Sequence, residues 1–274
     1  MTARERSAGF SSASVARRAM GHSIEELISI SIVDPLMGAE GWKFSNYPGS
    51  TPDALNGKER LYEVYLLAKR DFTGRVTVPV LWDKQRKTIV NNESSEIIRM
   101  LNSAFDPFTD ARDDFYPKRF RASINETNEL VYPHINNGVY RAGFATSQEA
   151  YEEAFRDLFK VLDTIERRLS TQRYLISGGI TEADWRLFTT LVRFDPVYFG
   201  HFKCNQRRIS DYPSLSNYLR ELYQRPGVSE TVNFDHIKRH YYMSHPQINP
   251  TRIVPLGPEI NLSAPHDRAR LGSA

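Results

Sequence analysis

The order of the periodic segments along the chain constrains its fold more than any other feature. Segments with strand character occur only before Asp106, where a strand, a helix, a β-hairpin and a second helix are predicted in succession. After Asp106 every periodic segment has helical spacing. A chain that keeps its strands in its first part and only helices in its second part is expected to form a small α/β domain followed by an all-helical domain.

Short sequence patterns predict the elements of the first part of the chain. Residues 27–33 alternate apolar and polar side chains, which indicates a strand. Residues 76–82 and 88–90 are rich in β-branched and apolar side chains and are separated by a short polar turn, so they predict a hairpin. Residues 61–68 have helical spacing, and polar capping residues predict a second helix that begins near Ser94.

The second part of the chain predicts helices over residues 114–131, 147–169, 181–191, 215–224 and 234–242. The helix at 181 begins with Thr181-Glu-Ala-Asp184, which has the spacing of a capping box. The Pro-rich segment from His245 onward is expected to be coil. We place the domain boundary after residue 106, so that residues 1–106 and 107–274 form the two domains.

Composition excludes several functional classes. Forty per cent of the 274 residues are hydrophobic and no long uncharged apolar run occurs, so the chain is expected to be globular, with no membrane association. The 36 basic and 33 acidic residues are interspersed, which leaves no basic stripe for nucleic acid. The one cysteine, Cys204, cannot form an internal disulfide or a cysteine zinc site. A single thiol is typical of a cytoplasmic protein.

Several longer motifs make the prediction more specific. They are Val33-Asp-Pro-Leu-Met-Gly38, Gly41-Trp42, Arg75-Val-Thr-Val-Pro-Val-Leu-Trp-Asp83, Asn92-Glu-Ser94, Thr181-Glu-Ala-Asp-Trp-Arg186, Tyr198-Phe-Gly-His-Phe-Lys-Cys-Asn205 and Ile248-Asn-Pro-Thr251. With these motifs, in this order from Ile28 onward, the chain resembles the glutathionyl-hydroquinone reductases, the Xi class of the glutathione transferase superfamily. The resemblance implies a thioredoxin-like N-terminal domain, here with its first strand missing, followed by an all-α glutathione-transferase C-terminal domain.

The resemblance also implies glutathione as cosubstrate. The residues that it assigns to glutathione binding are Trp42, Arg75, Val78, Pro79, Glu93 and Ser94. A cis Pro79 would expose the backbone of Val78 to a peptide ligand, and unpaired N–H groups at the helix start near Ser94 favour an anion. Without the resemblance, an edge strand and an ordinary helix cap are the favoured explanation of these residues, because helix caps are common and binding sites are rare.

Three tyrosines are assigned to the aromatic substrate or the reactive sulfur. By resemblance, Tyr140 exchanges a proton with the substrate, while Tyr198 and Tyr241 favour the ionised sulfur; Tyr242 competes with Tyr241 for that assignment. The alternative is that these tyrosines only pack in the helical domain. His236 and His240 are four residues apart, but the pair lacks the glutamate of HExxH, so no metal is predicted.

The main departure from the family lies near the start of the chain. The family's Cys-Pro-Trp-Ala-His-Arg motif supplies a cysteine that takes glutathione from a glutathionyl-hydroquinone as a mixed disulfide, and a second glutathione then reduces that disulfide. Here the corresponding position falls near Ser7, and the motif is absent. Serine cannot form a disulfide, and Cys204 matches a family position that is not the nucleophile. Either the assigned start or reading frame is wrong, or the chain has lost this thiol chemistry.

Three functions remain open at this stage. The first is a glutathione-dependent reductase of glutathionyl-hydroquinones, with aromatic quinone conjugates as partners and activity impaired by the missing cysteine. The second is a glutathione transferase or ligandin-like binder that uses a hydroxyl group. The third is a non-catalytic protein that forms a homodimer through its helical domain.

Overall fold

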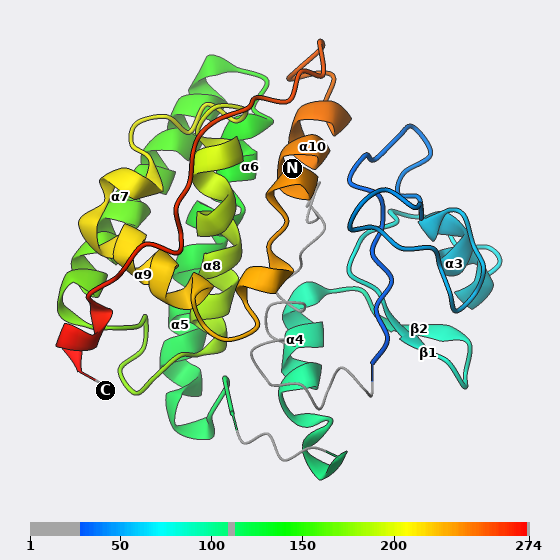
Figure 1. Cartoon of the computed structure of the whole chain (residues 1–274), viewed down its shortest axis with the longest axis horizontal. Helices are drawn as coiled ribbons and strands as arrows, with labels where there is room; N and C mark the ends of the chain where they lie inside the picture. Colours follow the sequence, from blue (N-terminus) through cyan, green and yellow to red (C-terminus); the bar gives the residue numbers. More distant parts are fainter. Residues whose placement is uncertain (1–27, 109–112, 273–274) are drawn as a thin grey trace. The chain divides into compact units, whose positions relative to one another are not determined.

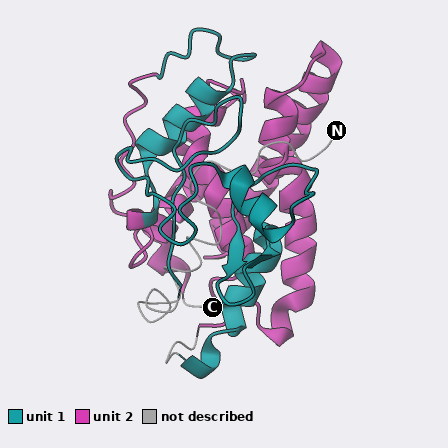
Figure 2. Cartoon of the chain, turned by 90° about the vertical axis from the view of Figure 1, so that its right-hand side faces the viewer, with its two compact units in different colours: residues 1–111, 231–254 teal, residues 112–230, 255–274 magenta. Residues whose placement is uncertain are grey.

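A computed structural model describes residues 28–108 and 113–272 (Figure 1). The chain forms two compact units (Figure 2). The first consists of residues 1–111 together with 231–254, and the second of residues 112–230 together with 255–274. None of the helices in the described ranges combines the length and apolar composition that a bilayer crossing requires.

The first unit contains the predicted hairpin. Strand β1 (Leu81–Asp83) pairs antiparallel with β2 (Thr88–Asn91), with Trp82 opposite Ile89 and an irregularity between Leu81 and Trp82. The first strand is shorter than residues 76–82, as predicted from sequence, because Pro79 has no N–H with which to extend a ladder. The prediction of a hairpin is therefore confirmed, and the start of its first strand was wrong.

The predicted strand at residues 27–33 is not part of this sheet in the described part of the chain, and Leu27 lies outside it. Residue Ile32 bonds instead to a single loop residue: its N–H donates to Thr51 Oγ1 at 2.8 Å, and its C=O accepts from Thr51 N at 2.8 Å. The alternating pattern therefore marks an extended segment that is fixed to a loop. The prediction that the first strand is missing, and the position near Ser7, also concern residues outside the described ranges.

Two helices of the first unit occur where the sequence predicts them. Helix α3 (Leu61–Ala68) buries Leu61, Val64 and Tyr65, which lie on one face at helical spacing. These three residues form a small core with Val33 and Trp42. Helix α4 (Ser94–Ser103) buries Ile97, Ile98 and Leu101 on its own apolar face.

Helix α10 (Phe234–Ser244) also belongs to the first unit, although it follows the helices of the second. The side chain of Asn233 caps it by accepting a hydrogen bond from His236 N at 3.1 Å. His236 Nε2 lies 2.7 Å from the carbonyl oxygen of Pro48, so this ring holds the neighbouring loop. Gly49 continues that loop with φ +87°, and a Cβ there would lie 2.8 Å from the Asn233 amide, so the close approach requires glycine.

The second unit is helical. Its helices are α5 (Arg121–Val131), α6 (Gly138–Gly143), α7 (Gln148–Thr171), α8 (Glu182–Arg193) and α9 (Pro213–Tyr223). Shorter turns lie at Lys118–Phe120, Tyr132–Asn136, Phe194–Tyr198, Ile209–Asp211 and Arg268–Leu271, while Asp106–Phe108 and Ser229–Thr231 lie near the ends of the first unit's segments.

The sequence places most of these helices correctly. The capping box at Thr181 is present, with both of its hydrogen bonds, at the start of α8. Helix α5 begins at Arg121 rather than near residue 114, because Pro117 is extended and a 3₁₀ turn precedes the helix. The short helix α6 and the π turns at Tyr132–Asn136 and Phe194–Tyr198 have too few residues to show a period, and the sequence did not predict them.

Helix α7 provides the centre of the second unit's core. Leu158, Leu162, Ile165 and Leu169 are each 0% exposed and follow one another at helical spacing. The end of α7 is capped from the C-terminal segment, where the guanidinium of fully buried Arg268 donates to the carbonyl oxygens of three residues. These are Leu169 at 2.6 Å, Gln172 at 2.7 Å and Arg173 at 2.5 Å. The predicted coil after His245 is thus anchored by one buried cation.

Candidate functional site

The predicted glutathione-binding residues all lie in the first unit. Val78 and Pro79 are half-buried and lie just before β1, from which Val80 separates them, and the peptide bond between them is cis, as expected. Within the described part of the chain, the backbone N–H and C=O of Val78 form no hydrogen bond. Two backbone groups are therefore available next to the hairpin, where the sequence predicts a peptide ligand.

Glu93 and Ser94 lie at the start of α4. Glu93 is the N-cap residue, and its carbonyl accepts from the N–H groups of Glu96 and Ile97, each at 3.0 Å. The N–H groups of Ser94 and Ser95 have no acceptor among the described residues. The first turn of α4 therefore presents unpaired donors together with one carboxylate, a combination that suits a ligand carrying both an anionic and a cationic group.

Trp42 is more deeply buried than a side chain whose only role is to contact a ligand. It is 2% exposed, and its ring stacks on His240 of α10 with the centroids 4.8 Å apart. His240 Nδ1 lies 3.1 Å from the carbonyl oxygen of Pro35, so this nitrogen carries the proton. Trp42 joins the loop after the first segment to α10, and its contact with glutathione stays a prediction. Arg75, by contrast, is exposed and is not without a partner.

Two of the predicted tyrosines are brought together in the second unit. Tyr140 on α6 is half-buried, and Tyr198 in the π turn after α8 is 2% exposed. Their hydroxyl oxygens are 3.4 Å apart. Phe202 lies parallel to Tyr198 within 13°, and a Cβ on Gly143 would come within 2.2 Å of the Phe202 ring. The absence of a side chain at Gly143 therefore permits the packing that holds both phenols.

Tyr241 lies in the first unit, on α10, and is 1% exposed. Its ring centroid lies 5.6 Å from that of His245. Tyr242 is half-buried, and its carbonyl oxygen accepts from Asn249 Nδ2 at 2.7 Å. The greater burial of Tyr241 does not by itself assign a role to either residue, so the choice between them stays a prediction.

Cys204 is a structural thiol. Its side chain is 0% exposed, and burial raises the pKa of the thiol far above its ordinary value. Its Sγ donates to the carbonyl oxygen of Phe202 at 3.8 Å. Because the thiolate is the nucleophilic form, a thiol held protonated in this way cannot attack a glutathione sulfur.

The histidines of α10 are committed to the packing of the first unit. His236 and His240 each face a backbone carbonyl, that of Pro48 and that of Pro35 respectively. In residues 28–108 and 113–272 no three side chains of His, Cys, Asp or Glu are arranged to hold a metal ion. The four-residue spacing of these histidines therefore reflects two loop contacts on one helix face.

Sequence reasoning missed a group of polar residues beside the proposed glutathione site: Tyr65, Thr77 and Asn92. Their side chains meet although they are separated by up to 27 positions. The sequence offered one weak signal, since Asn92 and Thr77 each stand immediately before a predicted site segment. No local pattern indicates that a tyrosine of α3 reaches both of them.

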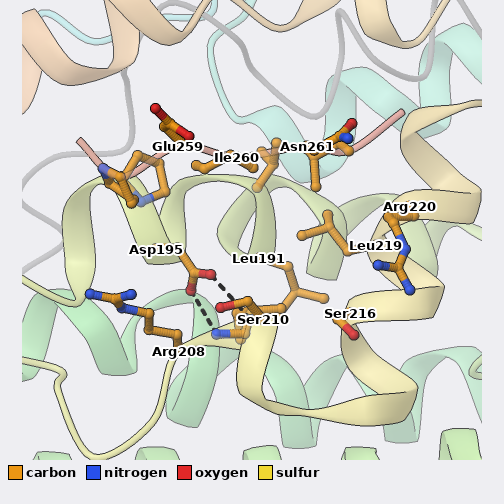
Figure 3. A pocket seen from close by; sticks show the side chains of 15 residues that line it. Leu191, Asp195, Arg208, Ser210, Ser216, Leu219, Arg220, Glu259, Ile260 and Asn261 are labelled. Carbon is orange, nitrogen blue, oxygen red and sulfur yellow. Dashed lines mark hydrogen bonds between the residues drawn. The ribbon is translucent and has the colours of Figure 1, made fainter. Parts of the chain in front are cut away.

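A pocket of about 140 Å³ lies in the second unit, and none of the predicted site residues lines it (Figure 3). Leu191 and Leu219 form part of its apolar wall, with Ile260 from the C-terminal segment on the opposite side. The carboxylate of Asp195 points away to Ile209 N at 2.6 Å and Ser210 N at 3.1 Å. The Asp195 carboxylate, which lines the pocket, thus holds the adjoining turn.

Comparisons with known proteins agree with this arrangement. Residues 33–104 match the glutathione S-transferase N-terminal domain, and residues 148–221 match the C-terminal domain of the same family. The chain is 54% identical over 246 residues to the glutathionyl-hydroquinone reductase YqjG of Escherichia coli, covering 89% of this chain and 75% of that protein.

Two further relatives extend the comparison. The chain is 55% identical over 235 residues to the glutathionyl-hydroquinone reductase PcpF of Sphingobium chlorophenolicum, which covers 86% of this chain and 75% of that protein. The glutathione-bound structure of Escherichia coli YqjG superposes with a TM-score of 0.92 at 53% identity, over 94% of this chain and 83% of that one. The predicted thioredoxin-like domain followed by a helical transferase domain is thereby confirmed.

Proposed function

Because the chain belongs to the glutathionyl-hydroquinone reductase family of glutathione transferases, we propose that it binds glutathione and acts on glutathionyl-hydroquinones. The observation that carries this proposal is the 54% identity to the Escherichia coli reductase over 246 residues. In the proposed reaction the bond between the glutathione sulfur and the ring carbon breaks, and the carbon takes a proton. That sulfur forms a disulfide with a second glutathione, which supplies the two electrons.

The contacts in the first unit support a glutathione cradle. The backbone N–H and C=O of Val78, which form no hydrogen bond among the described residues, can pair with the cysteinyl residue of glutathione, as in other extended-peptide complexes. The unpaired N–H groups of Ser94 and Ser95 can hold the γ-glutamyl carboxylate, and the Glu93 carboxylate can hold its ammonium group. Exposed Arg75 suits a second carboxylate.

The tyrosine pair of the second unit supports a role in proton transfer to the aromatic ring. With their hydroxyl oxygens 3.4 Å apart, one phenol of Tyr140 and Tyr198 can donate to the other and stabilise it as it gives up a proton. The half-buried side chain, Tyr140, is the one that we assign to the substrate. We assign Tyr241 to the reactive sulfur by family resemblance alone.

We further propose that the activity of this chain is impaired. Its 274 residues contain one cysteine, and Cys204 is buried and protonated. Without a cysteine thiolate the mixed disulfide on the protein cannot form, so the second glutathione must attack the conjugate directly. Such a loss of covalent catalysis lowers rates by at least about a hundredfold.

A turnover assay tests this function. The purified chain is incubated with glutathione and a glutathionyl-hydroquinone, beside the Escherichia coli reductase, and hydroquinone release and glutathione disulfide are quantified by chromatography. We expect saturable glutathione binding and glutathione-dependent release at less than about a hundredth of the comparison rate. Absence of glutathione binding contradicts the function, and full turnover contradicts the impairment. Cys204→Ser serves as the control, because replacing a buried structural thiol should leave the rate unchanged.

A hydroxyl-dependent glutathione transferase is the second candidate, and the burial of Cys204, which keeps its thiol protonated, favours it. A hydroxyl that donates to bound glutathione lowers the pKa of the glutathione thiol, so the thiolate itself can attack an electrophile. Conjugation of glutathione to an aryl halide by the same preparation, in the absence of hydroquinone release, distinguishes this candidate from the reductase.

The remaining assignments of location and assembly follow the family. We propose that the chain works in the cytoplasm as a homodimer, with glutathione and a quinone conjugate as its partners. A single, fully buried thiol is consistent with a reducing compartment. Light scattering after gel filtration measures the mass in solution and tests the dimer.

A further inference from the structure

Tyr65 is the centre of a hydrogen-bond network beside the proposed glutathione cradle. It lies on the buried face of α3 and is 2% exposed. Its hydroxyl donates to the carbonyl oxygen of Thr77 at 2.8 Å and accepts from the N–H of the same residue at 3.3 Å. Helix α3 is thus hydrogen-bonded, through the Tyr65 hydroxyl, to both the C=O and the N–H of Thr77.

Asn92 is a second hydrogen-bond partner of the Tyr65 hydroxyl. Its Nδ2 donates to the Tyr65 hydroxyl at 3.0 Å and to Thr77 Oγ1 at 3.2 Å. A phenol offers one donor and two acceptor positions, so these contacts use its full capacity. One buried hydroxyl therefore connects residues that are 12 and 27 positions away in sequence.

The two partners of Tyr65 stand immediately before the two halves of the cradle. Thr77 precedes Val78, whose backbone groups have no hydrogen-bond partner in residues 28–108 and 113–272, and Asn92 precedes Glu93 at the start of α4. Because hydrogen bonds tolerate only a narrow range of distance and angle, the shared hydroxyl restricts how far these two segments can move apart.

We propose that Tyr65 is a positioning residue that sets the spacing between the Val78 backbone and the first turn of α4, and thereby the affinity for glutathione. The inference rests on the proposed function, since glutathione must span both segments. Tyr65 itself touches no ligand in this arrangement. Its hydroxyl acts through Thr77 and Asn92 to hold the cradle in its binding geometry before glutathione arrives.

A purely structural role for Tyr65 can be separated from this one. The ring packs in the small core and lies 5.0 Å from the ring of Phe72. Tyr65→Phe keeps that packing and removes only the hydroxyl. A variant whose sole defect is stability binds with unchanged affinity but a smaller active fraction, whereas a displaced cradle binds more weakly at full stoichiometry.

Isothermal titration calorimetry of the full chain with reduced glutathione makes this distinction. We expect Tyr65→Phe to raise the dissociation constant about tenfold or more with the stoichiometry unchanged. Tyr62→Phe is the matched control, because Tyr62 lies on the same helix with its side chain 37% exposed, and its affinity should equal that of the parent chain. Equal affinity of the parent chain and Tyr65→Phe overturns the inference and leaves the function standing.

A second variant keeps the test valid if Tyr65→Phe folds poorly. Asn92 is exposed, so Asn92→Ala removes its two hydrogen bonds without opening the core. We expect Asn92→Ala to weaken glutathione binding as well. The double variant should have the affinity of the single variant that binds more weakly, and not a lower one, because both substitutions act through one hydroxyl. Wild-type affinity in Asn92→Ala, or additive losses, contradicts the inference. Failure of the parent chain to bind glutathione overturns both the inference and the proposed function.

Discussion

The two compact units hold their structures by different means. In the second unit, long amphipathic helices bury apolar side chains, and α7 alone contributes Leu158, Leu162, Ile165 and Leu169 at 0% exposure. The first unit has a short hairpin, a small apolar cluster and many hydrogen bonds from side chains to loop backbone. Apolar burial along long helices therefore organises the second unit, whereas hydrogen bonds from side chains to loop backbone fix much of the geometry of the first unit.

The proposed functional groups of the two units are held in place in correspondingly different ways. The proposed glutathione cradle lies in loops whose geometry is fixed by directional hydrogen bonds, such as those of Tyr65. The tyrosine pair lies in a packed aromatic cluster, where Gly143 and Phe202 fit without space for a methyl group. Polar changes should therefore perturb the first unit, and changes in side-chain volume should perturb the second.

The largest effect is expected from a cavity in α7. Leu158→Ala removes a fully buried side chain and should lower the free energy of unfolding of the second unit by about 4 kcal/mol. Hydrogen exchange of peptides from each unit measures where protection is lost. Lys160→Ala, at an exposed position of the same helix, should change protection little. Equal losses in the two variants would contradict the assignment of this core.

The next largest effect is expected in the pH dependence of the stability of the first unit. Burial lowers the pKa of His245 to about 4, from 6.5 as its ordinary value. Between these values the His245 side chain binds a proton in the unfolded chain and not in the folded chain, so its contribution to stability falls as pH decreases from about 6.5 to 4 and is constant above that window. The loss attributable to His245 is about 3 kcal/mol.

Denaturant unfolding at pH 7 and pH 4, followed in both the parent chain and His245→Gln, measures this loss. The variant lacks the titrating ring, so its stability should depend less on pH over this window. Peptides of the first unit should carry the difference in hydrogen exchange. Identical pH dependence in the two proteins would refute the contribution of His245.

The smallest effect is expected from one loop anchor of the first unit. The carboxylate of Asp53, which is 6% exposed, accepts hydrogen bonds from the N–H groups of Leu55, Asn56 and Lys58. Asp53→Ala removes the acceptor of all three N–H groups and should lower the free energy of local opening of this loop by about 2 kcal/mol. The loss is measured as faster hydrogen exchange in residues 51–60. Asp71→Ala, at an exposed position, is the control. Unchanged exchange in Asp53→Ala would show that solvent replaces the carboxylate at no cost.

Much of the helical unit could be predicted from sequence because its signals are local. The spacing of apolar residues located α7, and the Thr181 capping box located α8. The late start of α5 escaped prediction because the extended conformation at Pro117 overrides the helical pattern around it. The π turn that carries Tyr198 is a single turn, so no period could indicate it.

The candidate site could be predicted in part. Motif resemblance identified Glu93 and Ser94, and the capping pattern placed them at a helix start, where the structure has them. It could not show that Tyr65 connects the segments at Thr77 and Asn92, since those contacts depend on how α3 packs against the hairpin. Nor could it show how deeply Trp42 is buried against His240.

Sequence patterns identified the family, the hairpin, the order of the longer helices and the single cysteine. Those properties depend on residue identity and on spacing within a few turns of the chain. Three further properties emerged from folding: Cys204 is a buried, protonated thiol, α10 belongs to the first unit, and Tyr65 joins two segments that are distant in sequence. Burial and hydrogen-bond partners are properties of segments brought together by folding, and no local pattern specifies which segments meet.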